Sequence, residues 1–298
     1  MDELALSACD APPERVASRL LELGAYEALW MRERASFSSL ARLFRSRPGR
    51  RPADIVPRTE AERYAGMALA LARDAGIGEF DLLVHGTRAY PARLRDAAHP
   101  VEVLYCQGCP YLLELRCVAI VGTRHPSPAG VALAAQLARR FAQRGFGVLS
   151  GLAAGIDSVA HRAALDAGGA TVAVLGTPLT AVYPRANAEL QRRLARDHLV
   201  VSQVPIVRYT RQSMCRNHQF FRDRDATLAA LAEAVVIVEA GDRSGALICA
   251  RHALELRRPV FVPDQCSRDA NLAWPMRLIR QGAVCLRSIE DFDERLAI

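Results

Sequence analysis

Residues 148–176 read VLSGLAAGIDSVAHRAALDAGGATVAVLG, and this stretch decides the fold. Its two apolar ends predict buried strands, and the alanine-rich residues between them predict a helix. A strand, a helix and a second strand form the unit from which parallel sheets are built. Small and polar residues occupy the first strand-to-helix corner: Ser150, Gly151, Gly155 and Asp157. Such residues serve either tight packing or the approach of an anion to the backbone, and both interpretations are open.

The same alternation of strand and helix patterns extends along most of the chain. Short apolar runs predict strands at 117–122, 146–151, 171–176, 198–203, 234–240 and 258–263. Consecutive apolar positions in these runs are typical of strands buried on both faces. In the helix predicted at 128–145, the apolar stripe consists of Val131, Ala134, Leu137 and Phe141. The sequence therefore predicts an α/β fold, a doubly wound, mostly parallel Rossmann-like sheet that occupies residues 79–298.

The N-terminal part of the chain has a different pattern. Apolar residues recur at steps of three and four, which predicts a small helical domain over residues 1–78. The stretch RSRPGRRPADIVPRT at 45–59 interrupts this pattern and predicts an exposed linker or loop.

Composition favours polyanionic partners. The formal net charge of the 298 residues is +7, and all 39 basic residues are arginine. A GC-rich genome and selection for phosphate binding both explain the arginine bias, and either one gives a surface that attracts nucleic acid. No long apolar run predicts a membrane span, and the acidic N-terminus does not resemble a secretory signal, so we expect a cytoplasmic protein.

Glycine-rich turns follow four of the predicted strands. They read GTRHPSPAG, SGLAAGID, GTPLTAVYP and EAGDRSGAL. Because the carboxyl ends of parallel strands share one edge, these turns predict an anion-binding edge with backbone N–H groups, hydroxyls and arginines. Arg124 can form a fork onto a phosphate there.

The sequence was also read for nucleotide-binding, catalytic and metal sites, and these alternatives are as follows. The turns match neither the Walker A loop nor the dinucleotide motif, and no nucleophile elbow is present. CQGC at 106–109 is a zinc half-site without a second half, so we expect no metal. Asp157 and His161 are spaced for an acid–base or metal pair, but also for a local hydrogen bond or a helix cap. Glu239 could be catalytic, cap a helix or order an arginine.

The ordered motifs resemble the DNA-processing protein A family, also called DprA or Smf. The resemblance covers about residues 80–286 and rests on VAIVGTRHPSPAG, VLSGLAAGIDSVAHRAAL, GGATVAVLGTPLTAVYPRAN, VVIVEAGDRSGAL and LIRQGAV. It implies a non-enzymatic protein without metal or cofactor that binds single-stranded DNA. It also implies assistance to a RecA-type recombinase in recombination or natural transformation, and a homodimer.

The resemblance also implies a phosphate pocket built from the strand-end loops. The expected DNA- and phosphate-binding residues are Gly122, Thr123, Arg124, Ser150, Gly151, Arg222, Arg224, Arg243, Ser244 and Gly245. Arg222, Arg224 and Arg243 enter this set as cations beside the pocket.

Departures from the family pattern leave two alternatives open. The signature Phe-Pro-x-Arg-Asn-Arg keeps Phe221 and Arg224 here, whereas Asp225 and Ala226 replace Asn and the second Arg, in what we expect to be a loop. Asp264 stands where glycine is usual, and the chain ends where a winged-helix domain would follow. These changes fit a nucleotide- or DNA-sensing module in regulation or phage defence. An enzyme resembling nucleotide phosphoribohydrolases is a further alternative, although its Pro-Gly-Gly-x-Gly-Thr signature is missing.

Overall fold

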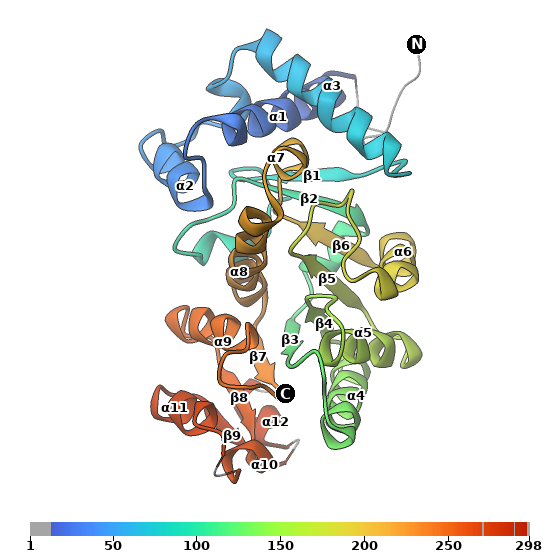
Figure 1. Cartoon of the computed structure of the whole chain (residues 1–298), viewed down its shortest axis with the longest axis vertical. Helices are drawn as coiled ribbons and strands as arrows, with labels where there is room; N and C mark the ends of the chain where they lie inside the picture. Colours follow the sequence, from blue (N-terminus) through green and yellow to red (C-terminus); the bar gives the residue numbers. More distant parts are fainter. Residues whose placement is uncertain (1–12, 270, 289, 297–298) are drawn as a thin grey trace. The chain divides into compact units, whose positions relative to one another are not determined.

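The chain folds into two compact units in the computed structural model, which describes residues 13–269, 271–288 and 290–296 (Figure 1). Residues 1–12, with Cys9 and most of the stretch considered as a leader, lie outside the described residues. The first unit combines the chain up to Gly108 with 175–182 and 200–224, and the second holds 109–174, 183–199 and 225–298. The predicted domain boundary after residue 78 stays a prediction.

The second unit is an alternation of strands and helices. Its elements are the 3₁₀ helix η3 (Pro110–Leu113), β3 (Cys117–Val121), α4 (Pro128–Gln143), β4 (Gly147–Ser150), α5 (Ile156–Asp166), β5 (Thr171–Leu175), η4 (Arg185–Asn187), α6 (Ala188–Asp197), β7 (Ala234–Ile237), α9 (Ala246–Glu255), β8 (Val260–Pro263), α10 (Asp264–Ser267), α11 (Trp274–Arg280), β9 (Val284–Leu286) and α12 (Glu290–Leu296).

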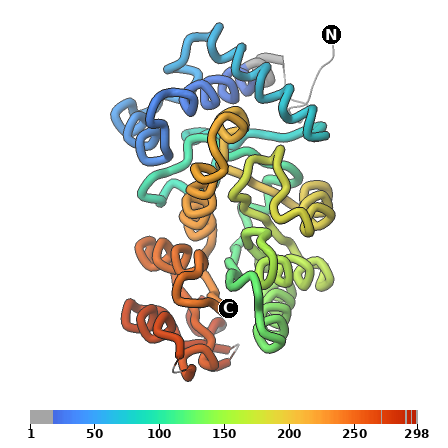
Figure 2. The backbone as a smooth tube through the Cα atoms, in the orientation of Figure 1, coloured from blue at the N-terminus to red at the C-terminus, as the bar shows by residue number. Residues whose placement is uncertain are grey.

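Its strands form a parallel sheet in the order β5-β4-β3-β7-β8-β9. The chain first winds from β3 to β5 and later from β7 to β9 in the opposite direction. In Figure 2 the green trace from β3 to α5 and the orange-red trace from β7 to α12 are these two halves. This is the strand order of doubly wound dinucleotide-binding folds, and the predicted fold class is confirmed.

The core of this unit forms as the predicted stripe requires, with one exception. Ala134, Leu137 and Phe141 are at most 2% exposed, whereas Val131 is 37% exposed. Val131 lies in the first turn of α4, so the buried stripe is one residue shorter than predicted. Phe141 also packs edge-on against Phe292, at 5.0 Å between ring centroids, which brings α12 into the same core.

The first unit contains helices around a short antiparallel pair. Its elements are α1 (Pro13–Met31), α2 (Phe37–Arg45), η1 (Pro52–Asp54), α3 (Arg58–Asp74), β1 (Asp81–Val84), η2 (Ala92–Asp96), β2 (Val103–Gly108), most of β6 (Leu199–Ser202), α7 (Ile206–Arg211) and the first part of α8 (Met214–Leu231). β1 and β2 pair antiparallel. The helical N-terminus is confirmed. The stretch 45–59, predicted as an exposed linker or loop, is mostly exposed and irregular apart from η1, and α3 begins at its end.

A buried carboxylate connects three elements of this unit. Glu27 on α1 is fully buried and accepts a hydrogen bond from the Tyr105 hydroxyl of β2, at 2.8 Å. It also accepts from the backbone N–H groups of Ile206 (2.7 Å) and Val207 (3.0 Å), at the start of α7. Burial raises the pKa of the Glu27 carboxyl to about 7, against the lowering effect of these three donors.

The segment expected to be a divergent loop at 221–226 is helical. α8 continues from Met214 to Leu231 without a break. The chain from 206 to 240 has neither glycine nor proline, and Arg222 stands where the family signature has its proline. Because proline cannot continue a helix, its absence explains why the loop prediction is wrong.

The predicted strands all form, but three further strands were not predicted. These three strands are β1, β2 and β9. β9 has only three residues and two of them are half-buried, so it lacks the run of buried positions that marks the central strands.

Candidate nucleic-acid interface

The candidate site lies at the carboxyl edge of the second unit's sheet. There the winding reverses between β3 and β7, which is where ligands bind in doubly wound sheets. The two strand ends are connected directly, because the Thr123 N–H donates to the Glu239 carbonyl at 2.7 Å. Gly122 and Thr123 are half-buried in this connection, and the Thr123 hydroxyl accepts from the His125 N–H at 3.2 Å.

The start of helix α4 is occupied by the protein's own carboxylate. Glu239 Oε2 accepts from the Ser127 N–H at 3.1 Å and from the Ser127 hydroxyl at 2.9 Å. Gly130 allows this approach, because a side chain there would overlap Glu239 Oε2. The cap of α4 is Ser127, whose hydroxyl accepts from the Gly130 N–H at 3.0 Å, and Glu239 holds this capping residue in place. A dinucleotide fold places a pyrophosphate at this helix start, and here a carboxylate takes that position.

The corner at residues 150–157, between β4 and α5, also holds a carboxylate of the protein. Asp157 is buried in the first turn of α5 and accepts from the N–H groups of Gly151 (3.1 Å) and Ala153 (3.3 Å). Gly155 has a φ of 80° and lies against the backbone of residues 123–124, where a side chain would overlap. The corner therefore serves both packing and an anion, but the anion is Asp157.

His161 contacts Thr171 of β5. It is fully buried, and its Nδ1 lies 2.7 Å from the Thr171 hydroxyl, which itself donates to the Val148 carbonyl. The hydroxyl has one proton to donate, so Nδ1 is the donor to it. His161 therefore has the hydrogen-bonded role of a core histidine.

Ser150 and Gly151 are buried as well. Ser150 is fully buried and its hydroxyl donates to the Ile120 carbonyl at 2.6 Å, which ties β4 to β3. Gly151 gives its N–H to Asp157. Because both residues are buried, we propose that they position the loops of this edge.

A third carboxylate lies by the start of α9. Gly245 precedes this helix. A Cβ atom added at Gly245 would lie 3.6 Å from Asp225 Oδ2, so the Asp225 carboxylate lies close to the helix start. Asp225 itself is 9% exposed. The Ser244 hydroxyl accepts from the Ala246 N–H at 3.3 Å, while Arg243 is exposed in the preceding turn.

An exposed arginine and tyrosine lie together at this edge. Arg124 extends from the turn after β3, and its Nη1 lies 3.4 Å from the Tyr183 hydroxyl. The guanidinium carbon is 5.8 Å from the centre of the Tyr183 ring, within reach of a cation–π contact. Tyr183 is 45% exposed, so part of its ring is open to a ligand. We call Arg124 and Tyr183 the arginine–tyrosine corner.

The turn that carries Tyr183 is fastened to the neighbouring loop. Asn187 is buried, and its amide donates to the carbonyls of Leu152 (2.9 Å) and Ala153 (3.2 Å). Leu152 adopts a φ of 58°, a left-handed conformation that costs roughly 1–3 kcal/mol for such a residue. Sequence reasoning did not assign Tyr183 or Asn187 to the site, although both lie in the quoted AVYPRAN motif.

The remaining predicted residues lie on α8 in the first unit. Arg222 is exposed there, while Arg224 is only 8% exposed. Of the predicted set, the second unit brings together Gly122, Thr123, Arg124, Ser150, Gly151, Arg243, Ser244 and Gly245 along one sheet edge.

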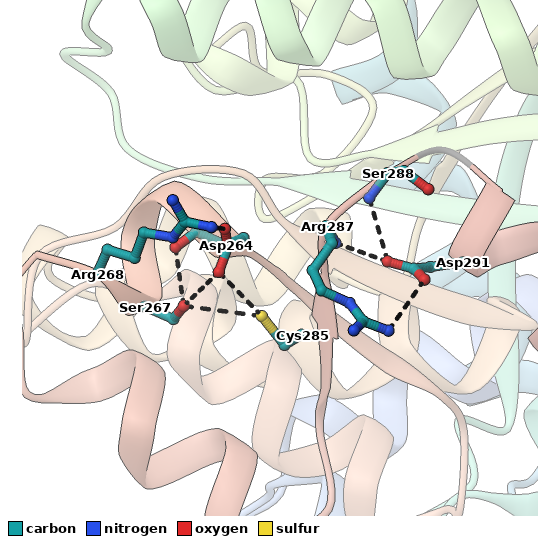
Figure 3. A network of polar contacts seen from close by, with 7 residues as sticks. All are labelled: Asp264, Ser267, Arg268, Cys285, Arg287, Ser288 and Asp291. Carbon is teal, nitrogen blue, oxygen red and sulfur yellow. Dashed lines mark hydrogen bonds and ion pairs between the residues drawn. The ribbon is translucent and has the colours of Figure 1, made fainter.

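A separate polar network surrounds the ends of β8 and β9 (Figure 3). Asp264 pairs with Arg268 and accepts from the Ser267 hydroxyl at 3.3 Å, and Cys285 Sγ lies 3.6 Å from it. Asp291 accepts from the N–H groups of Arg287 and Ser288. An open cavity of about 480 Å³ adjoins this network. The network gives Asp264, a departure from the family pattern, partners within its own helix and in β9.

The described residues offer neither a metal site nor a membrane span. Within 13–269, 271–288 and 290–296, no three His, Cys, Asp or Glu side chains are grouped so as to hold a metal ion. No helix in this described part of the chain has the length and apolarity needed to cross a membrane.

Known proteins match this chain over most of its length. The family model for DNA recombination-mediator protein A matches residues 81–297. The DNA processing protein DprA of Bacillus subtilis is 33% identical over 229 residues, which cover 76% of this chain and 74% of that protein. A putative DprA of Mycobacterium tuberculosis is 40% identical over 207 residues, 68% of this chain. The chain spans 51% of that relative and 50% of the Synechocystis protein Smf.

Two solved structures agree in fold. The crystal structure of DprA from Streptococcus pneumoniae has a TM-score of 0.65 at 27% identity, and the match covers 93% of this chain and 92% of that one. A structure from Helicobacter pylori has a TM-score of 0.62 at 28% identity, over 73% of this chain and 95% of that one. The latter is described as showing the single-stranded DNA binding mode of DNA processing protein A.

Proposed function

The chain belongs to the DNA recombination-mediator protein A family, and on this premise we propose that it binds single-stranded DNA in recombination or natural transformation. The observation that carries the proposal is the arginine–tyrosine corner, where a fixed cation and an exposed ring lie together at the sheet edge. Single-stranded DNA offers the matching pair of features, a phosphate and an unstacked base.

Side chains rather than helix starts hold the phosphates in this proposal. Carboxylates already lie at the starts of α4, α5 and α9, and they repel a phosphate placed there. Arg124 instead forks onto a phosphate and Tyr183 stacks the adjoining base, while Arg243 supplies a further phosphate contact. Arg222, on the first unit, is a separate candidate for a phosphate contact. Thr123, Ser244 and the glycines shape the surface on which the strand lies.

We place binding rather than catalysis at this edge. The acids that sequence reasoning considered for catalysis already accept hydrogen bonds, Glu239 from Ser127 and Asp157 from Gly151 and Ala153. A cytoplasmic homodimer that passes the strand to a RecA-type recombinase completes the proposal by family relationship. Light scattering of the purified protein, alone and with recombinase and DNA, tests these two partnerships.

Fluorescence anisotropy with a labelled oligo-dT strand tests DNA binding itself. We expect the wild type to bind, with an affinity that falls as salt rises. Arg124→Ala should weaken binding by about 30-fold, since hydrogen bonds to charged groups contribute ~1.5–3 kcal/mol. Arg139→Ala, an exposed arginine in the later turns of α4, is the matched control and should bind like the wild type. Absence of binding even at low salt would refute the proposal and turn attention to nucleotides as ligands.

A further inference from the structure

An unassigned cluster of charge lies in the first unit, from the last turn of α2 to the residue before η1. We call residues 42–51 the arginine segment. It contains no acid, and its five exposed arginines are Arg42, Arg45, Arg47, Arg50 and Arg51. Ten residues thus carry five positive charges, whereas the formal net charge of the whole chain is +7. The nearest acids along the chain are Glu33 and Asp54.

The arginine segment is a folded surface. Helix α2 begins with a capping box at Ser36 and buries Phe37, Leu40, Ala41 and Phe44. The Phe37 ring packs edge-on against Trp30, at 4.7 Å between centroids. After α2 the backbone turns through hydrogen bonds from Arg47 N–H to the Phe44 carbonyl and from Arg50 N–H to the Arg47 carbonyl. The arginines are therefore presented from ordered backbone, which lowers the entropy cost of binding.

Two of the five arginines already have partners. Arg51 lies 3.4 Å from Glu22, a buried carboxylate that also accepts from the Ala53 N–H. Arg45 donates to the Ala98 carbonyl at 3.1 Å. Within the described part of the chain, Arg42, Arg47 and Arg50 form no ion pair. Three neighbouring cations without acids repel one another, and a bound polyanion relieves this repulsion.

The chemistry of the segment favours phosphates on a flexible chain over a lipid surface. Helices that lie on membranes expose an apolar face, whereas the apolar face of α2 is buried and no exposed large apolar side chain falls within 42–51. Arginine forks match phosphate geometry and are less strongly hydrated than lysine. We propose that the arginine segment is a second phosphate-binding surface, which holds the sugar–phosphate backbone of single-stranded DNA. This inference rests on the proposed function of the sheet edge.

The test removes the three unpaired charges together. Arg42→Gln, Arg47→Gln and Arg50→Gln are combined in the full chain, and anisotropy with a 30-nucleotide dT strand is measured over a salt series. We expect about 10-fold weaker binding at low salt. The slope of log K against log salt should become shallower by about 2, at ~0.7 per lost phosphate contact on a single strand. Arg47→Glu, a single surface change, should weaken binding in the same direction.

A matched control separates the segment from overall charge. Arg58→Gln, Arg63→Gln and Arg73→Gln on α3 remove the same charge from exposed positions of the same unit. We expect this variant to bind like the wild type. Equal losses in both triple variants, or an unchanged slope in the segment variant, would overturn the inference. So would binding to phosphatidylglycerol vesicles that needs the segment while DNA binding does not.

The outcomes also distinguish this inference from the proposed function. If Arg124→Ala weakens binding and the segment variant does not, the sheet edge binds DNA and only the arginine segment is refuted. If the wild type fails to bind the strand at all, the proposed function fails first. Thermal unfolding of each variant, expected within about 2 °C of the wild type, shows that the exposed substitutions leave the fold intact, since such changes usually cost under ~0.5 kcal/mol.

Discussion

The starts of the helices and the arginine–tyrosine corner are two kinds of anion-ready surface in one protein. At α4, α5 and α7 the protein's own carboxylates, Glu239, Asp157 and Glu27, accept the backbone N–H groups that a ligand would otherwise use. Arg124, in contrast, faces outward beside an exposed ring. A glycine-rich turn at a strand end is therefore no sufficient sign of phosphate binding. What decides is whether a carboxylate from elsewhere in the chain has already taken the position.

The largest expected effect concerns Glu27, the most deeply buried of these carboxylates. Its pKa of about 7 in the folded protein lies above the ordinary value of 4.5, so folding favours the protonated form. The resulting stability is complete below pH 4.5 and is lost as pH rises through 7. At ~1.4 kcal/mol per pKa unit, the loss is on the order of 3 kcal/mol.

Urea unfolding at pH 5 and pH 8 measures this loss. In Glu27→Gln the side chain cannot titrate, so we expect a flatter dependence on pH. Glu22→Gln is the comparison: burial also raises the pKa of Glu22, another buried acid on α1, so this variant should flatten the pH dependence in the same direction but less. A wild type that is equally stable at both values of pH would show that Glu27 stays ionised across the range.

The next effect tests the open corner. Tyr183→Ala should weaken binding to oligo-dT by about 10-fold, since stacking of a base on an aromatic ring contributes ~1–3 kcal/mol. Tyr183→Phe keeps the ring and should retain most of the affinity. Tyr111→Ala is the control, because Tyr111 is 74% exposed in η3, before the amino end of β3. If anisotropy shows equal affinities for Tyr183→Ala and Tyr111→Ala, the ring at the corner has no part in binding.

Glu239 provides the opposite test, a change in stability without a change in binding. Glu239→Gln removes the charge from the start of α4 and should lower the free energy of unfolding by about 1 kcal/mol. Glu189→Gln, an exposed acid in the first turn of α6, should cost less. A large loss of DNA affinity in Glu239→Gln, at unchanged stability, would instead assign this carboxylate a functional role.

The smallest effect concerns Asp225, which lies by the start of α9. Asp225→Asn should tighten DNA binding about two- to five-fold, because a charge near a helix start contributes ~0.3–1 kcal/mol and this one repels phosphate. Asp166→Asn, at the far end of α5, is the control for a general change in charge. Weaker binding of Asp225→Asn would mean that Asp225 organises the edge for DNA.

The sequence predicts the centre of the sheet better than its margins. Strands buried on both faces, such as Cys117–Val121, are apolar at every position and were found. The three-residue β9, two residues of which are half-buried, was not. The prediction of a loop at 221–226 followed the family signature, whereas the local residues, without glycine or proline, form a helix.

The sequence predicts where the site lies, but not which side chains contact one another there. Arg124 was assigned from its position after a strand, and the structure places it at the exposed edge. The capture of Ser127 by Glu239 joins residues 112 positions apart, and no local pattern announces it. The pairing of Arg124 with Tyr183 joins residues 59 positions apart in the same way.

Photo-crosslinking tests the central claim most directly. An oligo-dT strand with 5-iododeoxyuridine at one position is bound to the wild type and irradiated, and the crosslinked peptide is identified by mass spectrometry. A base stacked on the ring at the corner places the main crosslink on Tyr183, and Arg124→Ala should reduce its yield. A main crosslink at Tyr111 or elsewhere away from the sheet edge, with yield independent of Arg124, would contradict the account.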